Sequence, residues 1–462
     1  MKDFWHYAFW VGLTAVFAIS LFNLVPVAAR VGMDFMTGNW ASQLHYQVAT
    51  AAATVSSPVL RSTVNDPVFT PPTRGKAIRA DLAAMKLSLY EDGNNIATYD
   101  IVAKGKPGSP WETPTGEYHV LLKKESHFSS LGEVWMPWSL QFFGNFFIHG
   151  RPYDETGKEL PDGYSGGCIR LATADAEMVY NFATSDTLVS VYGGKNEGVG
   201  TNSYELLSQT LPKVSAAAYA VVDLETGEVI LEHNLDQVYP IASLSKLLTA
   251  IVSLEIIDQS DLVNISKVAI DTYGTQGNLR LGENLPAQEL LYPLLLESSN
   301  DAAEAIARHF GRAEFIRALN NKASAIGLTD THFDDPSGLS PKNVSSARDL
   351  AKLSRYIYQS KRYIFDLTRR GAYDYANHHW VNGNKLVKQE NYLGGKNGFI
   401  DEARQTQIAL FELPLGEFSK RPVALVVLRS ANREADIKTL VEFIDTHTVF
   451  SETPKNPTFQ YL

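Results

Sequence analysis

Apolar and polar residues alternate in the region after residue 76, in the pattern of half-buried β-strands. Lys86–Tyr90 and Ile96–Val102 both alternate, and the residues between them, Glu91–Asn94, are typical of a hairpin turn. Phe146–Gly150 is an apolar strand pattern that ends at a glycine. The sequence therefore predicts a first domain that is mostly β.

A different pattern follows residue 214, where longer runs of helical character lie between strand-like segments. Leu244–Ile257 is apolar enough for a buried helix, and Ile408–Phe411 predicts an apolar strand near the carboxyl end. Three further segments favour helices: Gln288–Glu297, Asp301–Phe310 and Ala347–Tyr358. The second domain is therefore expected to mix helices with a sheet.

The N-terminus predicts the compartment. Residues 4–29 contain no Asp, Glu, Lys or Arg, and about 20 apolar residues are enough to cross the hydrocarbon layer of a membrane. Aromatic residues at positions 5, 7 and 10 suit a membrane interface. We expect residues 1–30 to form a transmembrane anchor, with a signal peptide cleaved after Val27-Ala28-Ala29 as the alternative. Either leaves the remaining chain outside the cytoplasm, in the cell envelope.

Composition divides the rest of the chain. Residues 31–75 are rich in Ala, Thr, Ser and Val and end in a Pro-containing stretch, which indicates a flexible spacer. A Gly-rich segment within 193–213 is the best interdomain linker. The predicted domains are therefore 76–192 and 214–450, followed by a C-terminal tail at 451–462.

Length, composition and charge limit the classes of function that the chain can have. A chain of 462 residues with 45% hydrophobic content is long enough for two independent cores. The net charge of −10 argues against nucleic acid as a partner. No His/Cys set has the spacing of a metal site and no Gly-rich loop suits a phosphate, so neither a metal nor another cofactor is expected.

Cys168 is the only cysteine in the chain, so no intrachain disulfide explains it. Gly166 and Gly167 precede it and allow a tight turn whose N–H groups can converge on an oxyanion. His149 lies 19 positions upstream, at the end of a predicted strand, where it can take the thiol proton. The alternative is a buried cysteine that acts as a small apolar residue.

These features together resemble the L,D-transpeptidase (YkuD) family over residues 76–192, including the stretch Thr113-Pro114-Thr115-Gly116. The resemblance implies that Cys168 attacks a stem peptide of peptidoglycan to form a thioester and that His149 is its base. It also implies oxyanion donors at the N–H groups of Gly167 and Cys168. Arg170 either holds a substrate carboxylate or forms an internal salt bridge. Many members have histidine where this chain has Gly166, and we assign no role to His119 or His127.

A second nucleophile signature is Ser243-x-x-Lys246 at the start of the predicted buried helix. The i, i+3 spacing places both side chains on one helix face, where a desolvated lysine can act as a base. Ser298-Ser299-Asn300 lies between two predicted helices, and plain N-capping is the alternative explanation for it. Lys396-Asn397-Gly398 precedes a polar turn and the apolar strand Ile408–Phe411.

The order of these three elements resembles the low-molecular-mass penicillin-binding proteins, the S11 D-alanyl-D-alanine carboxypeptidases and endopeptidases, over residues 214–450. The resemblance implies helices packed on an antiparallel sheet, as in serine β-lactamases. It implies that Ser243 is the acylated nucleophile and Lys246 its base. Ser298 and Asn300 then relay protons and bind the substrate amide, and Lys396 to Gly398 form the edge that attracts the terminal carboxylate. Asn397 departs from the family's Lys-Thr-Gly pattern.

The two resemblances imply one peptidoglycan-modifying enzyme with a cysteine L,D-transpeptidase site and a serine D,D-carboxypeptidase site. Peptidoglycan stem peptides are then the substrates and β-lactams the expected inhibitors. Alternatives remain for both halves. The serine domain can be a D,D-endopeptidase or an inactive wall-binding module, and the cysteine domain an L,D-carboxypeptidase or an enzyme that attaches proteins to the wall.

Overall fold

The computed structural model describes residues 63–64, 69–161, 163–193, 204–208, 210–274, 277–415 and 420–450. Residues 61–462 belong to one compact unit. The predicted anchor, most of the predicted spacer and the C-terminal tail lie outside the described residues. Among the helices that are described, none combines the length and apolarity needed to span a bilayer.

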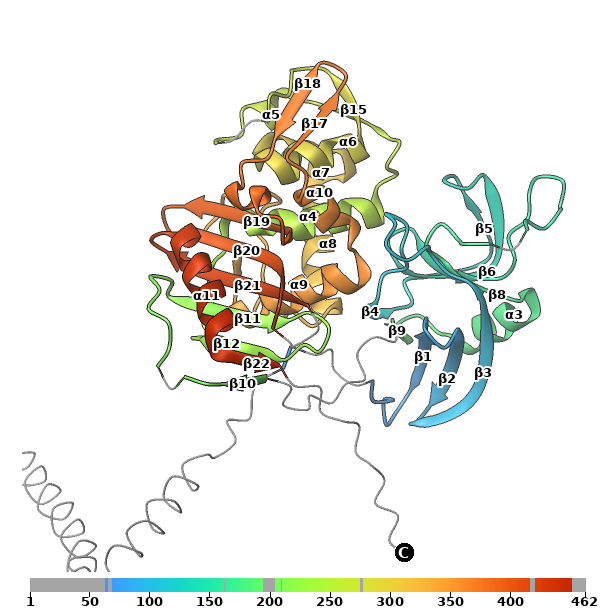
Figure 1. The fold of residues 1–462 in the computed structure, drawn as a ribbon. Helices are drawn as coiled ribbons and strands as arrows, with labels where there is room; N and C mark the ends of the chain where they lie inside the picture. The colour runs from blue at the N-terminus through green and yellow to red at the C-terminus, as the bar shows by residue number, and fades with distance from the viewer. Residues whose placement is uncertain are drawn as a thin grey trace, which may run out of the picture. The chain divides into compact units, whose positions relative to one another are not determined.

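The first domain is built on one curled sheet of nine strands (Figure 1). The strands lie in the order β4-β9-β1-β2-β3-β8-β7-β6-β5. Their bounds are β1 (Lys76–Asp81), β2 (Lys86–Glu91), β3 (Asn94–Ala103), β4 (Gly116–His119), β5 (Leu122–Ser129), β6 (Val134–Phe143), β7 (Phe146–His149), β8 (Ile169–Leu171) and β9 (Leu188–Tyr192), with helix α3 (Thr173–Phe182). The long strand β3 joins the two halves of the sheet, and the expected β2–β3 hairpin is present.

The second domain has a five-stranded antiparallel sheet in the order β12-β11-β21-β20-β19. Along β11, Ala218, Ala220 and Val222 pack into one hydrophobic cluster while Tyr219 and Val221 pack into another. Both faces are therefore buried, one under helix α9 and the other under helix α11 (Figure 1). The bounds are β11 (Ala218–Asp223), β12 (Val229–His233), β19 (Tyr392–Ile400), β20 (Arg404–Leu413), β21 (Arg421–Ser430), α9 (Ala347–Ser360) and α11 (Arg433–His447).

A helical part of the second domain surrounds α4 (Ser245–Ile256), all twelve residues of which are buried. The remaining helices are η1 (Ala242–Leu244), α5 (Lys267–Ile270), α6 (Ala287–Tyr292), η2 (Pro293–Glu297), α7 (Asn300–Phe310), α8 (Arg312–Ala325), α10 (Tyr363–Thr368) and η3 (Lys385–Lys388). Short strands form three small ladders: β13 (Tyr239–Pro240) with β16 (Val344–Ser345), β14 (Leu262–Asn264) with β15 (Asn284–Pro286), and β17 (Ala372–Tyr375) with β18 (His378–Val381). The predicted helix 288–297 is thus divided into α6 and η2.

Two segments that the sequence assigned to connections take part in the second domain. Strand β10 (Tyr204–Leu206), inside the predicted linker, pairs with β22 (Thr448–Phe450). Val64, in the predicted spacer, is buried, and its N–H donates to the Gly227 carbonyl at 2.8 Å. Both contacts are long-range pairings that composition does not encode.

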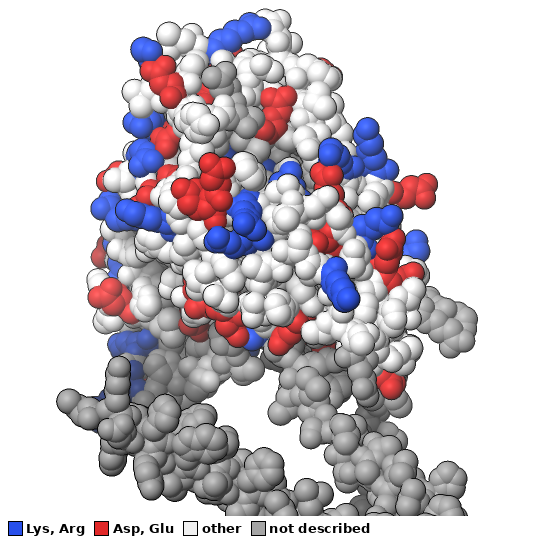
Figure 2. Space-filling view, turned by 90° about the vertical axis from the view of Figure 1, so that its left-hand side faces the viewer, with Lys and Arg blue, Asp and Glu red and all other residues white. Residues whose placement is uncertain are grey.

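One hydrophobic cluster runs through both domains, from Ile78 and Phe142 in the first to Leu247 and Phe365 in the second. The surface seen in Figure 2 carries Lys and Arg interspersed with Asp and Glu. The two domains therefore share one apolar core beneath a surface of mixed charge on that side.

Two candidate active sites

Ser243 lies in η1, directly ahead of α4, and Lys246 lies in the first turn of α4. The Lys246 Nζ donates to Ser243 Oγ at 3.0 Å, to Asn300 Oδ1 at 2.7 Å and to the Ser337 carbonyl at 2.6 Å. Burial lowers the pKa of Lys246 to about 7, although the Asp335 charge acts in the opposite direction. A large fraction of this amine is therefore neutral near pH 7 and able to accept a proton from Ser243.

Within the Ser298–Asn300 turn, one residue caps helix α7 and the other two face the serine site. Ser299 caps α7, because its Oγ accepts from the Ala302 N–H at 3.0 Å. Ser298 has left-handed backbone geometry with φ of 63°, and Asn300 bonds to Lys246. The capping that the sequence left open thus belongs to Ser299, while Ser298 and Asn300 face the serine site.

Lys396, on strand β19, reaches the same site from the sheet. Its buried Nζ donates to Ser298 Oγ at 2.9 Å and to the Asn397 carbonyl at 2.9 Å. Burial, followed by the charges of Lys246 and Arg433, holds the pKa of Lys396 well below its ordinary value. Lys246 and Lys396 therefore approach Ser243 and Ser298 from two elements that are far apart in the sequence.

Gly398 allows strand β19 to approach the nucleophile. A Cβ at this position would lie 2.8 Å from the Ser243 backbone nitrogen and 2.7 Å from Thr406 Oγ1. At the neighbouring position, the half-buried Asn397 has its Oδ1 3.5 Å from Lys396 Nζ. The amide oxygen at this departure from the family pattern therefore faces the buried Lys396 Nζ.

Two parts of the serine site were not assigned from sequence. The Asp335–Gly338 loop packs on the turn before Ser243, since a Cβ at Gly338 would lie 2.0 Å from the Ala242 carbonyl oxygen. Arg433, at the start of α11, donates from Nη1 to the Gly398 carbonyl at 3.0 Å. Sequence reasoning assigned no role to this loop, and nothing in the sequence around Arg433 marks it.

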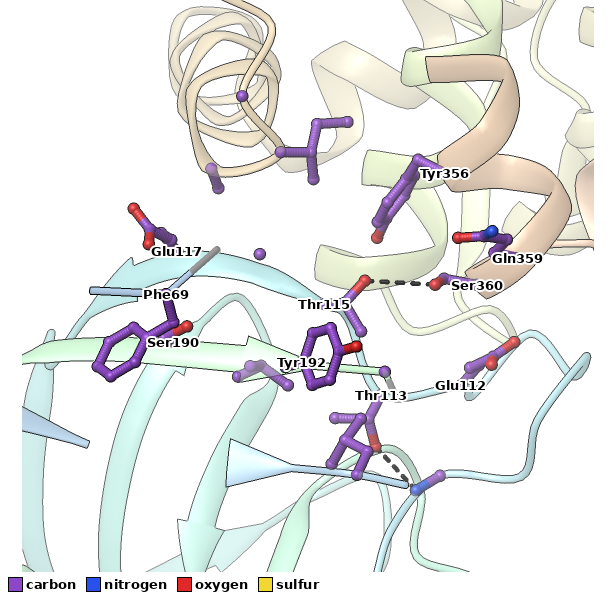
Figure 3. A pocket seen from close by; sticks show the side chains of 18 of the residues that line it. Phe69, Glu112, Thr113, Thr115, Glu117, Ser190, Tyr192, Tyr356, Gln359 and Ser360 are labelled. Atoms are coloured by element: carbon purple, nitrogen blue, oxygen red, sulfur yellow. Dashed lines mark hydrogen bonds between the residues drawn. The ribbon is translucent and has the colours of Figure 1, made fainter. Parts of the chain in front are cut away.

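The loop that presents Cys168 is fixed from two sides. Thr113 Oγ1 donates to the Gly167 carbonyl at 2.8 Å and accepts from the Gly105 N–H at 2.9 Å, a bond drawn in Figure 3. The Gly167 φ is 107°, and a Cβ there would lie 2.2 Å from the Phe146 ring. The Gly167 N–H donates to Ser165 Oγ at 3.2 Å. Service of this N–H as an oxyanion donor would therefore require it to exchange Ser165 for substrate.

His149 is the last residue of strand β7, and Cys168 directly precedes the adjacent strand β8. Strands β7 and β8 are parallel, with Ile148 opposite Ile169 and His149 opposite Arg170. Since alternate residues share a face, Cys168 and His149 point to the same side. Within the described residues, the thiol donates to the Asn145 carbonyl at 3.7 Å and makes no hydrogen bond to His149.

Electrostatics keep both groups neutral. Burial, aided by Arg170 and His127, lowers the pKa of His149 to about 4, against the effect of its bond to Gly150. Burial raises the pKa of the Cys168 thiol to about 11, while the Phe147 backbone and Arg170 act in the opposite direction. The His149 Nδ1 lies 2.5 Å from the Gly150 carbonyl, so in the neutral ring Nδ1 carries the hydrogen and Nε2 is the free base. Arg170 is itself buried.

The thiol lies in an apolar cup and is 8% exposed. Val134, Met136 and Phe147 form this cup with Cys168. His127 stacks on Phe147 with ring centroids 4.6 Å apart. A second imidazole therefore approaches the site from β5. His127 was assigned no role from the sequence, because only the folding of the β5–β6 hairpin brings it there.

A pocket of about 200 Å³ lies between β4, β9 and the carboxyl ends of α8 and α9, but contains neither nucleophile (Figure 3). Thr115 Oγ1 and Ser360 Oγ meet across it at 3.3 Å. In the described part of the chain, no cluster of three or more His, Cys, Asp or Glu side chains suits a metal ion.

Comparisons with known proteins match both halves. The profile of the peptidase S11 family, D-alanyl-D-alanine carboxypeptidase, matches residues 206–430. The profile of the YkuD family, L,D-transpeptidase catalytic domain, matches residues 75–191.

Individual relatives match the second half. A D-alanyl-D-alanine endopeptidase of Escherichia coli K12 is 33% identical over 256 residues, which are 52% of this chain and 80% of the relative. A D-alanyl-D-alanine endopeptidase of Pseudomonas aeruginosa is 30% identical over 252 residues, 51% of this chain and 79% of the relative. The solved D-alanyl-D-alanine carboxypeptidase of Mycobacterium tuberculosis H37Rv is 25% identical with a TM-score of 0.47, over 53% of this chain and 98% of that one. The chain therefore belongs to the peptidase S11 family of D-alanyl-D-alanine peptidases and carries, ahead of that domain, an L,D-transpeptidase catalytic domain of the YkuD family.

Proposed function

We propose that the chain is a bifunctional peptidoglycan enzyme, in which Ser243 acts as a D,D-carboxypeptidase nucleophile and Cys168 as an L,D-transpeptidase nucleophile. The observation that carries the proposal is the buried Lys246 Nζ, 3.0 Å from Ser243 Oγ. A lysine buried away from solvent has a lowered pKa and is a competent base. The hydroxyl that it contacts belongs to the serine that becomes acylated in the S11 family.

The serine reaction follows from these contacts. Lys246 takes the proton of Ser243 as the hydroxyl attacks the carbonyl carbon of the terminal D-Ala-D-Ala amide. Ser298, bonded to Lys396, can pass a proton to the departing D-Ala amine, and Asn300, bonded to Lys246, holds the stem-peptide amide. Water then hydrolyses the ester. The N–H donors of Lys396 and Arg433, beside Asn397 and Gly398, favour a substrate carboxylate at that edge.

The cysteine reaction begins from a neutral thiol and a neutral imidazole. The Nε2 of His149 accepts the thiol proton as the sulfur attacks the stem-peptide carbonyl. The thioester then forms as the amide C–N bond breaks, and His149 gives its proton to the amine of the departing D-residue. Arg170 stabilises the developing thiolate, since its charge favours the anion of Cys168. An amine from a second stem then attacks the thioester and completes a crosslink.

The two reactions suit each other in sequence. A D,D-carboxypeptidase converts a pentapeptide stem to a tetrapeptide, which is the acyl donor for an L,D-transpeptidase of this type. Tethering the two sites would raise the local concentration of that donor. If Ser243→Ala leaves Cys168-dependent crosslinking of pentapeptide stems unchanged, this coupling does not operate.

A D,D-endopeptidase activity is the second candidate for the serine site. Its support is that the relatives from Escherichia coli and Pseudomonas aeruginosa are both described as endopeptidases. An endopeptidase would cut crosslinks, so the protein would replace one type of linkage with the other. Purified crosslinked dimers and pentapeptide monomers are supplied to the protein separately. Ser243-dependent loss of the dimers indicates an endopeptidase, and Ser243-dependent loss of the pentapeptides indicates a carboxypeptidase.

The deciding experiment has two steps. Labelled penicillin should acylate the parent protein and not Ser243→Ala, whereas an inactive wall-binding module would leave both unlabelled. Digestion of intact sacculi after incubation with the protein should then reveal new crosslinks that Cys168→Ser does not form. Release of a terminal D-residue without crosslinks would instead indicate an L,D-carboxypeptidase, and a protein joined to the stem would indicate attachment.

The proposed location is the outer side of the cytoplasmic membrane, held there by residues 1–30. The support is the run of residues 4–29 without Asp, Glu, Lys or Arg. Membrane fractionation of the full chain and of a variant that lacks residues 1–30 tests this, and recovery of a shortened soluble protein from the full chain would favour signal cleavage.

A further inference from the structure

We propose that the serine-peptidase domain is a structural part of the cysteine site: the carboxyl end of α4, held by a buried cluster of Glu255, Lys322 and Lys361, positions the Gly144–Asn145 turn that orients Cys168. The catalytic part of this inference rests on the proposed L,D-transpeptidase function. The positioning part concerns the thiol itself and can be tested without substrate.

The cluster is buried on all sides. Glu255 lies in the last turn of α4, and Lys322 and Lys361 place their Nζ atoms 3.0 and 3.1 Å from its Oε1. The side chains of Glu255, Lys322 and Lys361 are 0%, 0% and 1% exposed. A carboxylate at the negative end of a helix dipole is unfavourable by itself, so the two cations are needed to hold it there.

Both lysines also reach into the cysteine domain. Lys322 donates to the Tyr118 hydroxyl at 2.8 Å, and Lys361 donates to the Glu112 carbonyl at 2.8 Å. Since a buried ammonium must fill its donor positions, these bonds fix the segment from Glu112 to Tyr118 against α8 and the end of α9. The same segment contains Thr113, which bonds to the Gly167 carbonyl beside the nucleophile.

A second route is more direct. The Asn145 N–H donates to the backbone carbonyl of Glu255 at 3.3 Å, and the Asn145 carbonyl accepts from the Cys168 thiol at 3.7 Å. Gly144 has φ of 46°, and a Cβ there would lie 2.6 Å from the Glu255 carbonyl oxygen. The turn therefore lies directly against the helix end, with no room for a side chain between them.

The consequence is that one helix serves both sites. Helix α4 begins two residues after Ser243, has Lys246 in its first turn and contacts the turn beside the thiol from its last turn. Twelve helical residues span about 18 Å. The cysteine domain thus depends for the geometry of its nucleophile on a carbonyl and a carboxylate that belong to the other domain.

The test uses the full chain and its only cysteine. Gly144→Ala should push the turn off Glu255, whereas Gly157→Ala is a matched control, because Gly157 has a positive φ of 80° but open space around its Cβ. The rate of Cys168 alkylation by iodoacetamide is measured from pH 6 to 10, and acylation of Ser243 by labelled penicillin is measured in the same samples.

We expect Gly144→Ala to raise alkylation at pH 7 about tenfold and to move its pH profile downward, because a thiol released to water titrates near its ordinary value. Penicillin acylation should stay within about twofold, as should both readouts for Gly157→Ala. If Gly144→Ala loses its native circular dichroism spectrum, Lys361→Met decides instead, with the same expected direction.

Alkylation rates and pH profiles that are equal for Gly144→Ala, Lys361→Met and the parent would overturn the proposal. Failure of the proposed transpeptidase function looks different: the parent would form no crosslinks from tetrapeptide stems, while the alkylation difference would remain. If both hold, Gly144→Ala should also lower the kcat of crosslinking about tenfold or more with little change in KM.

Discussion

The serine and cysteine sites are both buried, but burial has opposite effects on the groups that must react. At the serine site it lowers the pKa of Lys246 to about 7, which favours the neutral amine that the proposed mechanism uses as base. At the cysteine site it raises the pKa of Cys168 to about 11, which disfavours the thiolate that the proposed mechanism uses as nucleophile. Desolvation disfavours whichever form is charged, so it favours the neutral amine of a lysine and the neutral, protonated form of a thiol.

The two sites also differ in how they are connected. Lys246 makes three hydrogen bonds, two of them to Ser243 and Asn300, and Lys396 bonds to Ser298. The thiol of Cys168 instead lies among apolar side chains and donates only a long bond to Asn145 in the described residues. The side chains of the serine site are therefore already joined by hydrogen bonds, whereas in the proposed mechanism the thiolate of Cys168 forms only with the help of Arg170 and His149.

Removal of the proposed base, Lys246, tests the serine site most directly and should have the largest effect on its acylation rate. We expect Lys246→Met to slow penicillin acylation of Ser243 by about 10³-fold, within the range for removal of a general base. Lys352→Met is the control, since Lys352 bonds to Gly327 away from the site. A loss below about tenfold would mean that another group takes the first proton.

A steric change tests whether close approach of the sheet matters as much as the base. Gly398→Ala would place a Cβ 2.8 Å from the Ser243 nitrogen, and a displaced nucleophile should lower acylation about 10²-fold. Gly371→Ala is the matched control, because no atom lies within 4 Å of its Cβ. Stopped-flow acylation rates measure the difference. Equal rates for both variants would show that β19 can move enough to accommodate the added Cβ.

The opposite pKa shifts predict different pH profiles. Alkylation of Cys168 should rise about tenfold per pH unit from pH 7 to 10, because only the thiolate reacts and the pKa of the thiol is about 11. Acylation of Ser243 should rise with pH and level off above about 7, where Lys246 is already neutral. His149, with a pKa of about 4, stays neutral throughout and adds no inflection. An alkylation plateau below pH 9 would contradict the account of the buried thiol.

The smallest expected effect concerns the departure at Asn397. Asn397→Thr replaces an amide whose oxygen faces Lys396 with a hydroxyl that can donate to a substrate carboxylate, a gain of about 1 kcal/mol or roughly fivefold. We expect the ratio of carboxypeptidase to endopeptidase turnover to rise by that factor. Penicillin acylation of Gln407→Ala, altered opposite Asn397 across the β19–β20 ladder, controls for general disturbance of the strand. An unchanged ratio would mean that the side chain at position 397 does not contact the substrate carboxylate.

Much of the fold was predictable because its signals are local. The alternation at 86–102 predicted β2 and β3, the apolar run 244–257 predicted α4, and the segment 347–358 predicted α9. The hairpin expected around Glu91–Asn94 is present. The pairing of β10 with β22 was not predictable, since it joins segments more than 240 residues apart with no distinctive composition. The anchor expected at 1–30 lies outside the described residues.

The sequence by itself determined which atoms are candidates for reaction, because Ser243 with Lys246 and the glycines with Cys168 are neighbours along the chain and their spacing fixes the local geometry. Only the tertiary structure decided their surroundings. It brought Lys396 to Ser298, His127 to Phe147 and the end of α4 to the turn at Asn145. The pKa values belong to that second group, because the cost of a charge depends on how much water the surrounding fold excludes, and no short motif contains that information.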